Sequence, residues 1–134
     1  MIIDAIDSLL INNSSITDLV GNRIYSQVRE QSAGLPAITY QVISGIRNHD
    51  MSGPNGLVEG RVQINCFAAT ILGSLQLAAI VRAALSGFKG GSAGVEIECM
   101  LLGDQGDLPA IEPGNEAMNL FGQMMDFYVL YKEN

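Results

Sequence analysis

The stretch PAITYQVISGIRNHDMSGPNGLVEGRVQINCFAAT, residues 36–70, decides the fold because it reads as two long β-strands joined by a polar turn. Valine, isoleucine, threonine and tyrosine fill both flanks, and these residues favour strands. Between the flanks, residues 48–56 supply asparagine, aspartate, serine, proline and two glycines, which favour turns. The stretch therefore predicts a long β-hairpin.

Apolar and polar residues alternate along both arms of this hairpin, as expected for strands with one buried face. On the return arm, Val58, Gly60, Val62, Ile64 and Cys66 alternate with Glu59, Arg61, Gln63 and Asn65. On the outgoing arm, one side holds Ile38, Tyr40, Val42 and Ile46, and the other holds Thr39, Gln41 and Arg47. The first set of each arm is predicted to face the core.

The arms are long for a small protein. At ~3.3 Å per residue, about eleven residues span roughly 35 Å, whereas a usual strand has five or six residues. Two arrangements fit this length. Either part of the hairpin projects and offers a surface to another chain, or a strongly twisted hairpin folds wholly onto its own domain.

The same stretch resembles the small tail-completion proteins of long-tailed bacteriophages and prophages, also called tail terminators or tail-to-head joining proteins. The resemblance lies in Tyr40, Gln41, Ser44, Gly45, Arg47, Asn48, His49, Asp50, Gly53, Gly56, Leu57, Arg61, Val62, Gln63 and Ile64. It continues in residues 19–25, 78–88 and 126–131, so it covers nearly the whole chain. Its specificity lies in the order and spacing of these pieces. Phe67 and Leu130 stand where many relatives have tryptophan, and both keep a large apolar group.

The resemblance implies a structural virion protein. Copies of the chain are expected to form a ring, a hexamer in the family, that caps the tail tube, ends its growth and joins the tail to the head. The implied partners are further copies of the chain, the tail tube protein and the head connector or neck protein. The implied place is the head-proximal end of the tail, with assembly in the cytoplasm of a bacterial host. DNA is expected to pass through the ring without being specifically bound.

Composition fits one domain over residues 1–134 that needs neither a metal nor a disulfide to fold. Apolar residues make up 48% and charged residues only 16%, which indicates apolar surface covered by a partner. The net charge of -7 argues against gripping DNA through its phosphates. In a ring it predicts an acidic or neutral lumen along which DNA slides; the alternative is that the acids only keep the protein soluble.

The fold class predicted is α+β, an antiparallel or mixed sheet of four or five strands with two main helices on one face. Helices are expected at residues 1–12 and 70–86, with a short helical turn at 15–20. Strands are also expected at 95–102 and 118–131, and an edge strand or extended segment at 23–28. Residues 118–131 are apolar on both faces, as in a central strand or in one that a partner covers. Residues 89–94 read as a connector and 103–116 as a long loop. Residues 66–85 are hydrophobic, but they contain Gln76 and Arg82 and begin in a strand, so no membrane span is expected.

Cysteine and histidine give no sign of chemistry. Cys66 and Cys99 are each predicted on the apolar face of a strand, so reduced core thiols are expected and not a disulfide or metal pair. The single histidine, His49, has Asp50 beside it but no serine or cysteine nucleophile in a known arrangement. No zinc spacing or calcium loop is present. Asp4 and Asp7 interrupt the first apolar turn, which argues against a signal peptide. No enzyme, cofactor or metal is predicted.

The candidate interface residues are therefore polar groups of the hairpin. Arg47, His49 and Asp50 lie in its loop region, and Glu59 and Arg61 lie on the exposed strand face. Mixed charges on a projecting element suit a heterologous contact between subunits. The alternative is that each is an ordinary surface charge.

Besides a hydrolase that uses His49, which would need a nucleophile near it in space, two rival functions remain open. One is a head-side neck or connector-completion protein, which would share the ring but touch a different partner. The other is a small dimeric ligand-binding α+β module, which would need a deep apolar pocket with convergent polar groups.

Overall fold

The computed structural model describes residues 2–21, 23–26, 36–51, 53–92, 94–108 and 121–132. The helices are α1 (Ile2–Ile11), α2 (Ser14–Val20) and α3 (Ile71–Leu85). The strands are β1 (Ile24–Ser26), β2 (Ala37–Asp50), β3 (Gly53–Ala68), β4 (Gly90–Ser92), β5 (Val95–Leu108) and β6 (Phe121–Lys132). The α+β class and the two long hairpin strands agree with the prediction from sequence.

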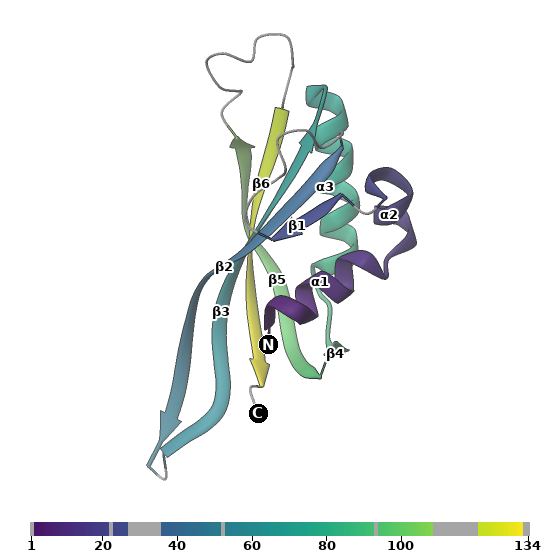
Figure 1. The fold of residues 1–134 in the computed structure, drawn as a ribbon. Helices are drawn as coiled ribbons and strands as arrows, with labels where there is room; N and C mark the ends of the chain where they lie inside the picture. Colours follow the sequence, from purple (N-terminus) through teal and green to yellow (C-terminus); the bar gives the residue numbers. More distant parts are fainter. Residues whose placement is uncertain are drawn as a thin grey trace.

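The strands form one mixed sheet in the order β1-β2-β3-β6-β5-β4. Only the β1–β2 pair is parallel. The described chain thus holds six strands where four or five were predicted, and the short β4 lies inside the predicted connector. β6 lies between β3 and β5, so of the two arrangements expected from its apolar faces the structure has the central strand. The three helices lie on one side of the sheet (Figure 1). We call the other side, which no described helix covers, the open face.

The β2–β3 hairpin is longer and its turn tighter than predicted. Both strands extend into the predicted turn, with Asp50 opposite Gly53. The pairing of β3 with β6 ends at Leu57 and Lys132, so the hairpin beyond Leu57 has no third strand among the described residues. This end extends past the rest of the sheet (Figure 1). We call it the arm, residues 47–56.

The core fills the space between the helices and the sheet. Phe127 of β6 is fully buried at its centre. Around it pack the apolar faces of α1, α3, β3 and β6, including Ile6, Leu10, Leu77, Val81, Leu85, Val62, Ile64, Met125 and Val129. The Tyr40 hydroxyl donates a hydrogen bond of 2.9 Å to Asp7 Oδ1 and so ties β2 to α1. Burial, followed by the hydrogen bond and the negative charge of Asp7, raises the pKa of Tyr40 above its ordinary value.

The ends of α3 lie one residue inside the predicted range. Thr70 precedes the helix with extended backbone, and its side-chain oxygen accepts a 2.9 Å hydrogen bond from Gly73 N. This N-cap satisfies one of the donors that a helix leaves open at its start. After the helix, Gly87 N donates to Met100 O at 2.6 Å, which fastens the end of α3 to β5.

β-bulges correct the predicted side-chain directions on two strands. The register of β2 shifts between Val42 and Ser44, so Ile43 is an extra residue there. Ile46 consequently pairs with Glu59 and lies on the open face. The prediction that Ile46 faces the core was therefore wrong.

The register of β5 shifts twice, between Ile97 and Cys99 and between Leu102 and Asp104. Past the first shift, Met100 is fully buried, whereas Cys99 and Leu101 are exposed. The predicted core position of Cys99 was wrong. Cys66 is buried as predicted, both cysteines are free thiols, and burial raises the pKa of Cys66 to about 12.

β5 continues to Leu108, so the predicted loop was wrong over residues 103–108. The rest of that predicted loop, and the predicted start of β6 at residues 118–120, lie outside the described residues. Polar side chains hold the extension in place. Gln123 of β6 is buried, and its Nε2 atom donates a hydrogen bond to Asp107 Oδ1. Gln105 Nε2 in turn donates to Gln123 Oε1 at 3.3 Å.

Candidate assembly surface

Two neighbouring rows of side chains cross the open face from β2 to β5. The strand registers align Ile46, Glu59, Leu130 and Cys99 in one row, and Ser44, Arg61, Tyr128 and Leu101 in the next. We call these eight residues the band. Ile46, Leu101 and Tyr128 are large apolar or aromatic residues that are each more than half exposed. Side chains of this kind grouped on one face are typical of an interaction surface.

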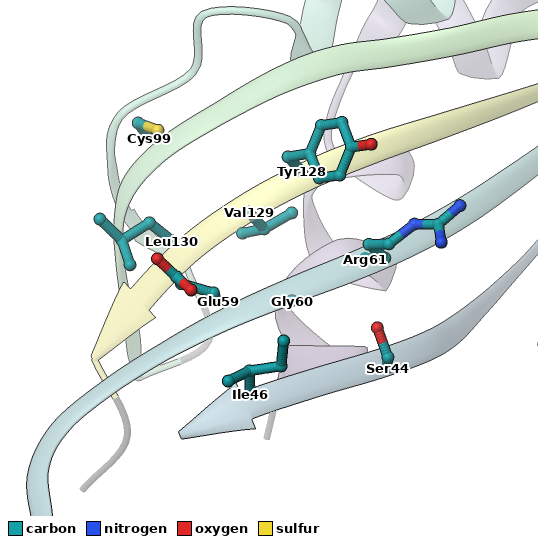
Figure 2. A pocket seen from close by; sticks show the side chains of 9 residues that line it. All are labelled: Ser44, Ile46, Glu59, Gly60, Arg61, Cys99, Tyr128, Val129 and Leu130. Atoms are coloured by element: carbon teal, nitrogen blue, oxygen red, sulfur yellow. The ribbon is translucent and has the colours of Figure 1, made fainter. Parts of the chain in front are cut away.

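A groove of about 390 Å³ runs along the band (Figure 2). Figure 2 shows Ile46 and Ser44 on β2 along one side, Glu59 and Arg61 on β3 in the middle, and Tyr128 and Leu130 on β6 beyond them. Seven of the band residues line the groove, together with Gly60 and Val129.

Glycines under the groove let an aromatic ring pack closely from the helix side. Gly45 and Gly60 are register partners. A Cβ atom on Gly60 would lie 3.3 Å from Tyr131 Cε1, and one on Gly45 would lie 3.9 Å from the Tyr131 hydroxyl oxygen. The buried Tyr131 ring thus occupies the side of the sheet opposite the band.

Arg61 is held by residues of β6. Its Nη2 atom donates to Asp126 Oδ2 at 2.9 Å, and its guanidinium carbon lies 5.9 Å from the centre of the Tyr128 ring. The Arg61 side chain is 44% exposed and that of Asp126 only 12%. The ion pair and the cation–π contact therefore fix Arg61 in place and neutralise Asp126.

A second acid lies close to this pair. Asp104 of β5 is the direct register partner of Asp126, so two carboxylates face each other across neighbouring strands. Like charges in that position repel. Asp104 Oδ1 accepts a 2.9 Å hydrogen bond from Gln105 N, which turns it toward its own backbone. Through its ion pair with Asp126, Arg61 offsets the repulsion between the Asp104 and Asp126 carboxylates.

The Tyr128 ring lies against the backbone of Gly103, the extra residue at the second bulge of β5. A Cβ atom on Gly103 would approach Tyr128 Cε2 to 2.0 Å, a distance that no real pair of carbon atoms adopts. Tyr128 is therefore positioned between Gly103 and Arg61. Any side chain at Gly103 would displace the ring.

The five predicted interface residues fall on two separate surfaces. Glu59 and Arg61 lie in the band. Arg47 is exposed on the arm, and its register partner is the buried Val58, so it points to the opposite side of the sheet from Glu59. His49 and Asp50 pair with Pro54 and Gly53 at the end of the arm, and their side chains lie outside the described part of the structure.

A metal or membrane role gains no support. Among the described residues, no three histidine, cysteine or acidic side chains are grouped so that they could hold a metal ion. None of the helices in the described ranges is long and apolar enough to cross a membrane.

The family model of the tail completion protein gp17 matches residues 4–98, which include the whole β2–β3 hairpin and α3. The chain belongs to this family. It is a structural protein of a phage tail. No match is found among the curated proteins.

A solved structure supports the fold of this gp17-family chain. It is similar to a chain of a structure described as the virion of a native gene transfer agent particle, with a TM-score of 0.70 and 15% sequence identity. The alignment covers 96% of this chain and 92% of the other. The resemblance seen in the sequence is thus confirmed at the level of the family, which is a family of virion proteins and not of enzymes.

Sequence reasoning missed several residues of the candidate assembly surface. Tyr128 and Leu130 were recognised as apolar, but nothing in the sequence indicated that their face of β6 stays uncovered. Ile46 and Cys99 were assigned to the core because strict alternation was assumed. The pairing of Arg61 with Asp126, 65 positions away, leaves no local signal.

Proposed function

We propose that copies of this chain, each a single domain, form a ring at the head-proximal end of the tail tube. The ring, a hexamer as the family resemblance implies, stops tube growth and joins the tail to the head. The observation that carries this proposal is the uncovered band on one side of the sheet, opposite a side covered by helices. A subunit with two different sides joins its neighbours through heterologous contacts, and such contacts generate rings when the rotation closes.

Termination follows from geometry under this proposal. One face of the ring matches the bonding surface of the tail tube subunit, and the other face lacks that surface. The next tube layer then finds no template, so growth ends. The second face is free to contact the head connector or neck protein. This role requires neither catalysis nor a cofactor.

The proposal includes passage of DNA through the ring. The chain carries seven basic and fourteen acidic residues, and this balance favours an acidic or neutral lumen that does not hold phosphates. Replacing lumen acids by lysine is expected to slow genome delivery in a salt-dependent way. Unchanged delivery in such variants would overturn this part of the proposal.

The main test uses bacteria that assemble the particle without this chain. Electron micrographs are expected to show overlong tails that carry no heads, and supplying the chain from a plasmid should restore uniform length. Tails of normal length, left unjoined beside filled heads of normal connector structure, would instead place the protein elsewhere.

A binding experiment separates the tail-side role from the head-side role directly. Purified chain is mixed with isolated tail tubes or with filled heads, and bound protein is recovered by sedimentation. The proposal expects binding to the tubes in the absence of heads. Binding to filled heads alone would favour a neck or connector-completion protein.

A further inference from the structure

The arm carries an apolar side chain with no cover from its own subunit. Met51 lies at the turn between β2 and β3, and its side chain is fully exposed. It lies beyond the last β6 partner of the hairpin, on the part that extends past the sheet (Figure 1). The flexible side chain of methionine is suited to packing into a groove of irregular shape.

The open face of the same subunit carries a mainly apolar groove. The groove over the band measures about 390 Å³ and is lined by Ile46, Tyr128 and Leu130 (Figure 2). Its own arm does not reach it. Met51 lies five positions beyond Ile46 in the direction of β2, and Ile46 lies three strands across the sheet from Cys99. These two perpendicular displacements place the Cα atoms of Met51 and Cys99 roughly 20 Å apart.

We propose that the arm of one copy inserts Met51 into the groove of the next copy. Each chain carries both this arm and this groove, so copies of this chain alone can supply both halves of the contact. The contact joins two different surfaces, which is the heterologous geometry that closes a ring. The inference rests on the proposed function and adds the residues that would form its subunit contact.

Charge supports the same pairing. Arg47 is exposed at the base of the arm, and Glu59 is exposed beside the groove, so the two surfaces carry opposite charges near their apolar centres. Opposite charges on facing surfaces guide association and fix orientation. The pairing also explains why the predicted interface residues lie on two surfaces, because a heterologous contact needs both.

Disulfide trapping tests the inference, because Cys99 lies in the groove and is exposed. In a Met51→Cys variant, a bond between the new thiol and Cys99 has to join two subunits, since a disulfide needs Cα atoms within about 7 Å. Mild oxidation of the purified protein, or of tails that contain it, is expected to give a ladder of cross-linked chains on a non-reducing gel. Adding Cys99→Ser should abolish the ladder.

Leu72→Cys is the matched control. Leu72 is exposed to 65% on α3, which lies on the helix side of the sheet, and the inference expects no ladder from it. A ladder from Leu72→Cys and none from Met51→Cys would overturn the inference in favour of a helix-to-groove contact. Dimers from Met51→Cys that survive Cys99→Ser would overturn it in favour of a symmetric arm-to-arm contact.

A second variant separates the contact from the fold. Because Met51 touches little of its own subunit, Met51→Asp should leave the melting temperature unchanged and weaken self-association at least about tenfold, measured by light scattering. Unchanged association would overturn the inference. If oxidised tails contain the ring but no bond between residues 51 and 99, the inference fails while the proposed function stands. If tails lacking the chain have normal length and heads, the proposed function fails instead.

Discussion

Replacing Arg61 with alanine is expected to destabilise the protein more than replacing its partner Asp126. The Arg61→Ala change removes a 2.9 Å charge-assisted hydrogen bond and a cation–π contact with Tyr128. It also leaves Asp126, whose side chain is only 12% exposed, directly opposite Asp104 with no cation between them. The Asp126→Ala change loses the same hydrogen bond, but it leaves an Arg61 side chain that is 44% exposed and can turn to water.

The magnitudes follow from these exposures. A hydrogen bond to a charged group contributes about 1.5–3 kcal/mol when buried, and the exposure of Arg61 places this one near or below the lower value. The cation–π contact adds roughly 0.5 kcal/mol, and the unopposed carboxylate pair costs a few tenths more. Arg61→Ala is therefore expected to lower the free energy of unfolding by about 2 kcal/mol. Asp126→Ala should lower it by less than about 1 kcal/mol, because it also relieves the repulsion from Asp104.

The assay is urea unfolding followed by circular dichroism at pH 7 and two salt concentrations. Adding Asp104→Asn to the Arg61→Ala protein should recover part of the lost stability, and high salt should recover part of it in the single variant. The reasoning is refuted if Asp126→Ala costs as much as Arg61→Ala, or if Asp104→Asn restores nothing.

Three further predictions concern single positions. Gly103→Ala should push the Tyr128 ring away, which a changed tyrosine signal in near-ultraviolet circular dichroism would report; an unchanged signal would contradict the close packing. Burial raises the pKa of Cys66 from 9.0 to about 12, so the thiolate forms more readily in the unfolded chain than in the folded protein. The free energy of unfolding should therefore be constant below pH 9 and fall by on the order of 1 kcal/mol per pH unit between pH 9 and 12. In Cys66→Ala the fall should begin about one pH unit later, where Tyr40, whose pKa is also raised, starts to titrate in the unfolded chain; an unshifted onset would count against this assignment. Tyr40→Phe should cost about 1–2 kcal/mol by removing the hydrogen bond to Asp7, measured in urea, and Asp7→Asn should cost less because an amide oxygen still accepts; equal costs would argue that the acceptor's charge matters more than the bond itself.

Local sequence patterns predicted most of the helices and strands. The alternation on β3 holds from Val58 to Cys66 without a bulge, so each residue lies on its predicted side. The caps and glycines around α3 placed its ends to within one residue. These features depend on neighbours in the chain, which a sequence displays directly.

The side-chain directions past the bulges could not be predicted in this way. On β5, Glu96 and Glu98 alternate with Val95 and Ile97, and continuing this alternation puts Cys99 on the buried side. Residues 99–102 are all apolar, so nothing in them shows that the two sides are exchanged at the bulge. The exchange depends on the extra residue at Glu98, which sheet packing stabilises. The candidate site was affected most, because all its edge residues on β2 and β5 lie past bulges.

The central place of β6 sets an order of events during synthesis. β6 follows β2, β3 and β5 along the chain, yet it lies between β3 and β5. A growing polypeptide on the ribosome therefore holds two separate β units until β6 emerges and inserts between them. Tyr128 and Leu130 arrive with that strand, so an unfinished chain lacks half of the groove wall. Under the proposed contact, such a chain cannot accept the arm of a second copy ahead of time.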